Sequence, residues 1–144
     1  MSERSYHNAP KTQGVRHVTY NVQVLPQGGM TPPLLGEGDP GESFMTVQRG
    51  ASGIAGATGQ TGTYVVRTKD PFIAMVTQLG NLGLSFGSGG PAAGWSLKFG
   101  VPTQQSDGTW AVWFQVYNSS TLEDLNLGDQ VSLQMTFRNS ITVP

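Results

Sequence analysis

Few residues in this sequence could act as a nucleophile, a general base or a metal ligand. Its two histidines, His7 and His17, do not show the H-x-x-x-H or H-E-x-x-H spacing through which one helix holds zinc. Cysteine is absent, which removes thiolate nucleophiles, disulfides and cysteine metal sites. We therefore expect neither a metal centre nor a cofactor site on these side chains.

Two groups of carboxylates could in principle bind a metal ion or act as catalytic acids. Glu37, Asp39 and Glu42 lie in a glycine-rich loop and could offer oxygen ligands to calcium, but they lack the D-x-[DN]-x-[DN]-G order, which favours a solvated turn. Glu123 and Asp124 are adjacent and would point in different directions, unlike the paired carboxylates of a glycosidase. The nucleophile motif G-x-S-x-G is also absent. The sequence therefore predicts a protein that is not an enzyme.

Aromatic side chains offer a different kind of chemistry, the stacking of a sugar or of a partner. Trp95, Trp110 and Phe114 alternate with polar residues and are expected in a hydrophobic core. Trp113 and Tyr117 fall on the opposite face of the same segment. Either a second layer of the protein or a partner must cover these two residues.

Glycine recurs at every third position from Gly50 to Gly62, in the stretch GASGIAGATGQTG. A strand pattern follows, so the segment does not fit a dinucleotide-binding fingerprint, and Thr63-Tyr64 follows the last glycine where a phosphate-binding loop has Lys-Ser or Lys-Thr. Three interpretations stay open: a flexible or extended connector, which we favour; a short collagen-like triple helix; and a segment packed against a neighbouring subunit or a symmetry axis. The last two predict a homo-oligomer, with a trimer favoured over a dimer.

The elements that must position these residues are strands, because apolar and polar side chains alternate along most of the chain. The expected strands cover residues 15–24, 44–47, 63–69, 71–79, 82–86, 95–101, 110–117 and 130–138. Residues 71–79 are apolar on both faces and are expected at the centre of a sheet. The Asp107-Gly108 pair predicts a tight reversal, and only residues 120–125 could form a helical turn. About eight strands indicate an all-β fold, an antiparallel, jelly-roll-like β-sandwich.

Composition and spacing predict one folded domain with an extension. Residues 1–14 are polar and aperiodic and are expected to form an extended N-terminal arm, and residues 15–144 a single sandwich. That domain contains a proline- and glycine-rich loop, 26–43, and the glycine segment, 50–62. Only 12% of the residues are charged, while 20 are glycine and 9 are proline, which favours many turns.

Charge and hydropathy narrow the classes of partner. Eight basic and nine acidic residues are scattered along the chain and give a net charge of −1, so no basic face for nucleic acid is expected. No apolar run suggests a signal peptide or a membrane span. Contacts with a protein partner are expected at ten positions: Arg4, Tyr6, His7, Lys11, Gly50, Gly53, Gly56, Gly59, Trp113 and Tyr117.

Two stretches carry a resemblance to a known group of proteins. GTYVVRTKDPFIAMV (62–76) and LGDQVSLQMTFRNSITVP (127–144) contain strands of the types G-x-Y-x-V-x-x-x-D and V-x-L-x-φ-x-F-R/K-N-S, where φ is apolar and R/K is arginine or lysine. Through these two motifs, the chain from residue 44 onward resembles small structural proteins of tailed bacteriophages.

The resemblance implies a capsid decoration, or cement, protein. Such a protein is a non-enzymatic β-sandwich that is made in the host cytoplasm, binds the major capsid protein and stabilises the outer surface of the head. The glycine triplets depart from that pattern, since collagen-like runs are more familiar in fibres. The alternative expectation is therefore a fibre or spike module that binds a receptor or a glycan.

Overall fold

The computed structural model describes residues 15–36, 44–83 and 94–140. The expected arm (1–14) and the acidic residues Glu37, Asp39 and Glu42 lie outside these residues. So does the end of the expected strand 82–86.

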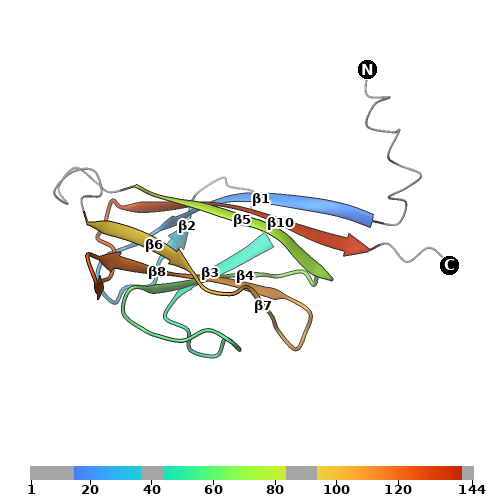
Figure 1. The fold of residues 1–144 in the computed structure, drawn as a ribbon, viewed down its shortest axis with the longest axis horizontal. Coiled ribbons are helices and arrows are strands. Elements are labelled where there is room, and N and C mark those ends of the chain that lie inside the picture. Colours follow the sequence, from blue (N-terminus) through green and yellow to red (C-terminus); the bar gives the residue numbers. More distant parts are fainter. Residues whose placement is uncertain (1–14, 37–43, 84–93, 141–144) are drawn as a thin grey trace, which may run out of the picture.

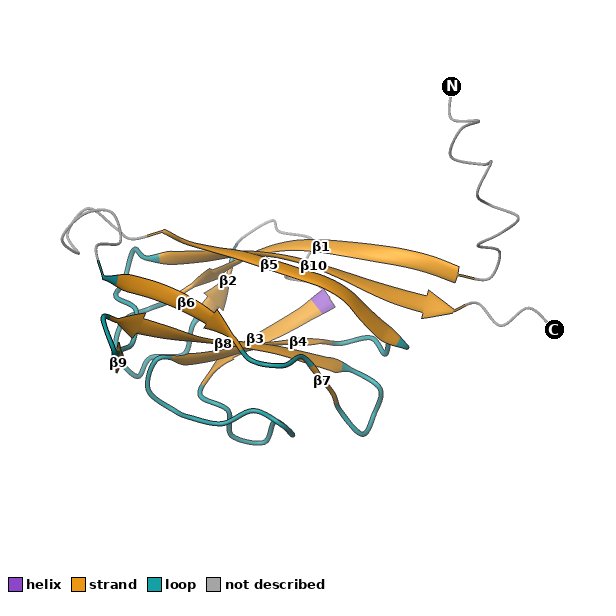
Figure 2. Ribbon diagram, in the orientation of Figure 1, coloured by secondary structure: helices purple, strands orange, loops and turns teal. Residues whose placement is uncertain are grey.

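The described residues form ten strands in two antiparallel sheets (Figure 1). The strands are β1 (Val15–Leu25), β2 (Leu34–Leu35), β3 (Met45–Arg49), β4 (Thr63–Thr68), β5 (Ala74–Gly83), β6 (Trp95–Phe99), β7 (Thr103–Gln104), β8 (Trp110–Asn118), β9 (Thr121–Leu122) and β10 (Gln130–Ser140). One sheet has the order β2-β1-β10-β5 and the other β3-β4-β8-β6, with β7 and β9 also paired to β8. Figure 2 shows the two sheets as separate layers. The prediction of an all-β antiparallel sandwich is confirmed, whereas the jelly-roll strand order stays a prediction.

The core lies between the two layers and is built from the alternating side chains that the sequence pattern identified. From the first sheet, the inward residues of β1 and β10 include Val22, Val24 and Phe137, all nearly inaccessible to solvent. Tyr64 of β4 and Phe114 of β8 face them from the second sheet, with ring centroids 5.6 Å apart. Each such side chain contributes about 1.5–3 kcal/mol relative to leaving it exposed, so this layer stabilises the sandwich.

The strand expected at the centre of a sheet lies instead at an edge. Residues 74–79 and 82–83 of the two predicted strands belong to one strand, β5, which pairs with β10 alone among the described residues. Its outward side chains Val76 and Leu79 are 47% and 61% exposed. Apolar residues on both faces suggested burial on both faces, but no layer of the described chain covers the outer one.

Two shorter predictions have opposite outcomes. Asp107 and Gly108 form the expected reversal, between β7 and β8, with Gly108 at a φ of +86°. Residues 120–125 are not a helical turn. Ser119 has a φ of +57° and reverses the chain, so that Thr121 pairs with Asn118.

The predicted strand 95–101 is also shorter than expected. β6 ends at Phe99, and Val101 is 80% exposed rather than inward. Proline at position 102 has no N–H for a ladder, and the chain then continues as β7 along the same neighbour, β8.

Candidate interaction surfaces

The glycine segment has a conformation that a triple helix does not allow. All five glycines from Gly50 to Gly62 have φ between +69° and +101°. Collagen chains need a φ near −75°. In this structure the segment is therefore not a triple helix.

Linked turns explain the period of three. Ile54 N–H donates to the carbonyl of Ala51 (3.1 Å), and Ala57 N–H donates to the carbonyl of Ile54 (3.4 Å). Gly53 and Gly56 occupy the third position of these turns, where a type II turn requires positive φ. Because Ile54 ends one turn and begins the next, the glycines at the third positions of these two turns, Gly53 and Gly56, are three residues apart.

The segment folds back on its own sheet and is not an extended connector. Gly50 N–H donates to the carbonyl of Thr63 (2.7 Å), which closes the loop at its base. The side-chain amide of Gln105 accepts from Ala55 N–H (3.0 Å) and donates to its carbonyl (3.4 Å), which ties the loop to the β7–β8 connection. Ile54 packs there with Val65 on the outer side of the second sheet.

Trp113 is covered by this loop and by the end of β6. Its indole packs against the cluster formed by Ile54, Val65 and Ala111, and its Nε1–H donates to the carbonyl of Val101 (3.2 Å). Gly100 lies against the indole ring of Trp113, which occupies the space that a Cβ at position 100 would need. A loop of the same chain therefore supplies part of the cover for Trp113, and a contact of Trp113 with a partner stays a prediction.

Tyr117, the other expected contact residue, is half-buried beside a charged neighbour. Lys98 Nζ lies 4.6 Å from the centroid of its ring, and its hydroxyl donates to Gln115 Oε1 (3.2 Å). A cation over an aromatic face contributes about 0.5–1 kcal/mol at an exposed site. A sugar that stacked on this face would displace Lys98.

Asp124 has a structural role that the sequence did not reveal. Its carboxylate receives two hydrogen bonds from Arg49 (3.0 and 2.8 Å) and one from Gly62 N–H (2.8 Å). The hydrogen bond with Asp124 raises the pKa of Arg49. Next to it, the Tyr64 hydroxyl accepts from Leu125 N–H (2.9 Å), and burial raises the pKa of Tyr64 to about 12.

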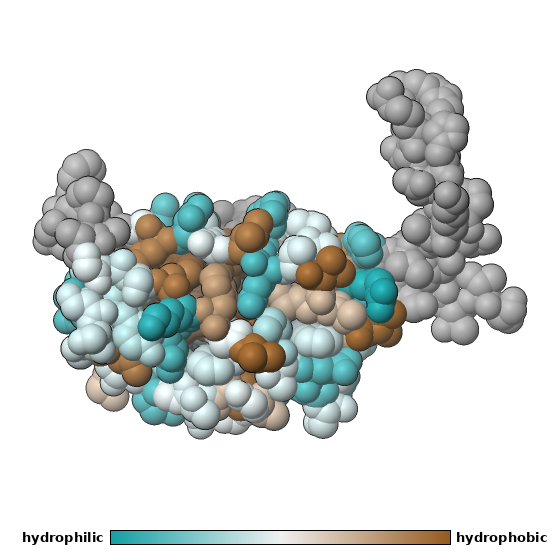
Figure 3. Space-filling model, viewed as in Figure 1, coloured by the Kyte–Doolittle hydropathy of each residue, from teal (hydrophilic) through white to brown (hydrophobic). Residues whose placement is uncertain are grey.

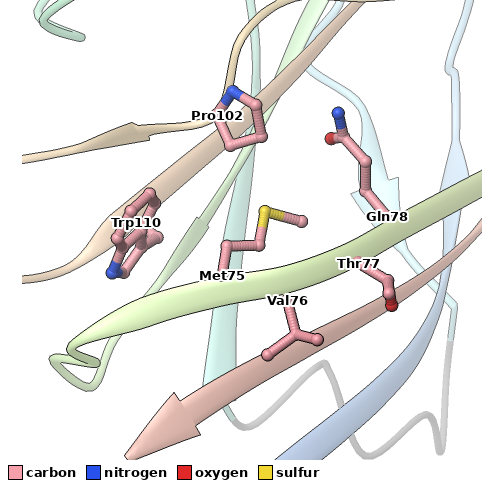
Figure 4. A pocket seen from close by; sticks show the side chains of 6 residues that line it. All are labelled: Met75, Val76, Thr77, Gln78, Pro102 and Trp110. Carbon is pink, nitrogen blue, oxygen red and sulfur yellow. The ribbon is translucent and has the colours of Figure 1, made fainter.

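A shallow hollow of about 260 Å³ opens between the layers at the edge formed by β5 (Figure 4). Met75 and Gln78 point from β5 toward Pro102, whereas Val76 and Thr77 point away from it. Gln78 Oε1 is buried and has no hydrogen-bond partner among the described residues.

A second hollow, of about 270 Å³, has polar walls that include Arg67, Lys69 and Asp107. Arg67 pairs with Asp107 (2.6 Å) and donates to Thr109 Oγ1 (2.9 Å). Thr109 donates hydrogen bonds to Asp107, and these lower the pKa of Asp107. The larger effect comes from the Thr109 hydroxyl and the smaller from its backbone N–H. The charges of Arg67 and Asp107 are therefore engaged with each other.

The outer side of the sheet β2-β1-β10-β5 is an exposed polar surface, and we call its central part the neutral face. It consists of three rows across β1, β10 and β5, namely Thr19, Thr136 and Thr77; Asn21, Gln134 and Leu79; and Gln23, Ser132 and Asn81. None of these side chains is charged. Thr19 and Thr136 share a hydrogen bond (2.9 Å), and Gln134 donates to Asn21 (3.0 Å).

Of the expected contact residues, Arg4, Tyr6, His7 and Lys11 lie outside the described residues. The others, Gly50, Gly53, Gly56, Gly59, Trp113 and Tyr117, gather on the outer side of the second sheet, opposite the neutral face.

Comparison with known protein families, with curated proteins and with solved structures gave no match. Within the described ranges, no three His, Asp or Glu residues lie together as a metal site would require. No helix in the described part of the chain has the length and hydropathy of a transmembrane span.

Proposed function

We propose that this protein is a non-enzymatic structural protein that binds and stabilises the outer surface of a tailed-phage head. Its partner would be the major capsid protein. Two features support the proposal: residues 62–76 and 127–144 resemble strands of small structural proteins of tailed bacteriophages, and the fold is an all-β sandwich. The observation that carries it is the neutral face, an exposed surface of hydroxyl and amide groups on a hydrogen-bonded sheet.

The chemistry of the neutral face suits adhesion. Hydroxyl and amide groups both donate and accept hydrogen bonds, so they can pair with the backbone or side chains of a shell protein. Since no charge is involved, binding through this face should depend little on salt.

Many such contacts repeated over a shell would hold the protein by avidity. A protein that binds only the assembled shell stabilises that shell by mass action. In this proposal the arm (1–14) adds a second contact with the shell. The glycine segment is packed on its own sheet, and its contact with a neighbouring subunit stays a prediction.

The test is the occupancy of heads that lack the protein, measured after adding it back. We expect deletion of residues 1–14, or the double substitution Thr19→Lys and Gln134→Lys in the neutral face, to reduce occupancy at least tenfold. Ser96→Lys, which adds one lysine at an exposed position on the other sheet, is the control, and Thr19→Lys alone is its counterpart in the neutral face. Thermal unfolding of each variant shows that the sandwich is intact. Occupancy that is unchanged in both variants would overturn the proposal.

The alternative, a fibre module that binds a glycan, depends on Trp113 and Tyr117 as an open platform. Trp113 is covered by the glycine segment, and Tyr117 lies under Lys98. Saturable binding on a glycan array, lost in Tyr117→Ala, would favour the fibre module instead.

A further inference from the structure

The outer edge of β5 is a long strand edge without the features that usually protect one. Ala74–Gly83 spans ten residues, contains no charged residue and no proline, and has no partner strand on its outer side among the described residues. Natural proteins protect such edges with lysine, proline, bulges or short strands. Here a single irregularity, at Val76, leaves Thr77–Gly83 regularly paired with β10.

The other edges of the described sheets differ from this one. β3 and β6 have five residues each and carry Arg49 and Lys98 respectively, and β2, β7 and β9 have only two residues each. β2 pairs with β1 only at Val24 and Leu25, so most of the β1 edge also has no partner strand among the described residues, but that strand contains the basic residue Arg16. Of these edges, the β5 edge is therefore the one that best allows an uncharged strand of another molecule to pair with it. Figure 3, which views the molecule from the side of β5 and β6, shows hydrophobic side chains exposed there between polar ones.

We propose that the β5 edge pairs with the β5 edge of a second copy of this chain, antiparallel and about a two-fold axis at Leu79. A two-fold contact requires a surface that is complementary to itself. The β5 edge meets this requirement, because two uncharged strands approach without repulsion and an antiparallel pairing satisfies the N–H and C=O groups of both.

Leu79 sets the register of this pairing. It is the one apolar side chain in the neutral face, and it is 61% exposed. With the axis at Leu79, the two leucines lie side by side and bury each other, and Thr77 of each copy lies opposite Asn81 of the other. The first sheets of the two copies then form one continuous sheet, which doubles the neutral face.

The size of the contact indicates a dimer that depends on concentration. A ten-residue edge is about 34 Å long, and a single layer of side chains on each side of it gives a contact at the small end of specific interfaces. We therefore expect a dissociation constant on the order of micromolar. The earlier expectation of a trimer depended on the glycine segment, which is folded on its own sheet. The dimer inference does not rest on the proposed function.

Disulfide trapping tests the register, because the native chain contains no cysteine. Side chains directly opposite each other in antiparallel strands have Cβ atoms about 4.5–5.5 Å apart, which is close to disulfide geometry. Under mild oxidation we expect Leu79→Cys to form covalent dimers at least tenfold faster than Leu127→Cys, whose parent residue is 67% exposed on a loop. Thr77→Cys mixed with Asn81→Cys should cross-link, and each alone should not.

Mass in solution tests the association itself. Between 1 and 500 μM, roughly the range that a micromolar constant requires, we expect the full chain to change from 15.3 kDa to twice that mass. Leu79→Lys should abolish the change, and Leu127→Lys should not. Both parent residues are exposed, so neither substitution disturbs the core. Three results would overturn the inference: a monomer throughout the range, a trimer, or equal cross-linking of the Leu79→Cys and Leu127→Cys variants. A monomer would indicate that the β5 edge pairs with a strand of another protein, if it pairs at all.

Discussion

Arg49 and Asp124, 75 residues apart in the sequence, form a two-point ion pair at the base of the glycine segment. Their side chains are 12% and 15% exposed. Because Asp124 also accepts from Gly62 N–H, one carboxylate joins the end of β3, the loop and the segment before β10. The pair therefore closes the loop that covers Trp113.

Removing Asp124 should destabilise the protein. Asp124→Ala removes the acceptor of Arg49 and of Gly62 N–H in a partly buried site. We expect this loss to lower the free energy of unfolding by about 3 kcal/mol. The control is Glu123→Ala, which removes the same charge from an exposed neighbour and should change stability by less than about 0.5 kcal/mol. Urea unfolding of the three proteins measures both values. Equal losses in the two variants would show that net charge, rather than the pair, is responsible.

Turn geometry in the glycine segment predicts two unequal costs. At Gly53 a Cβ meets open space, so Gly53→Ala should cost only the positive φ, about 1 kcal/mol. At Gly56 a Cβ would also lie 2.6 Å from Thr103 Oγ1, so Gly56→Ala should cost about 3 kcal/mol. Thermal unfolding checks the order. A freely flexible connector would tolerate both changes at no cost.

The sequence could show the spacing of these glycines but not their conformation. Glycine adopts positive φ and the φ of a triple helix almost equally well, so Gly53 and Gly56 fit both structures. What decides between them is the packing of Ile54 on Val65, a contact between side chains that the sequence cannot pair. The Asp124 pair could not be predicted for the same reason, since Arg49 follows the predicted strand 44–47 and Asp124 lies in the segment 120–125 that was expected to turn as a helix.

Strand positions were more predictable than strand neighbours. Alternation at Tyr20, Val22 and Val24 identifies β1 and its buried face, because period two is a local property of a strand. The edge position of β5 is not local. Val76 and Leu79 would look the same if a further layer covered them, and only the tertiary structure shows that none of the described residues does.

Tyr64 predicts a loss of stability at alkaline pH. Burial raises its pKa from 10.0 to about 12, so the folded state holds its proton more tightly than the unfolded state does. The contribution of Tyr64 is therefore complete below pH 10 and declines as the pH rises from about 10 to 12, by about 1–2 kcal/mol.

Urea unfolding at pH 8, 10 and 11.5 measures this decline, with Tyr64→Phe as the comparison. The variant loses the acceptor for Leu125 N–H, which costs about 1 kcal/mol at pH 8, but its stability should fall less steeply above pH 10. Tyr20, whose pKa is raised chiefly by burial, contributes a decline of the same sign to both proteins. Identical slopes would mean that Tyr64 is not buried as described.

Gly100 and Trp113 should be energetically coupled. The indole occupies the position of a Cβ on Gly100, so Gly100→Ala must push the ring away from Ile54 and Val65, at a cost of about 2 kcal/mol. In a Trp113→Ala background the space is empty, and the same substitution should cost less than about 0.5 kcal/mol. A double-mutant cycle measured by urea unfolding gives the coupling directly. Additive effects would place the indole away from Gly100, and Trp113 would then be free to meet a partner.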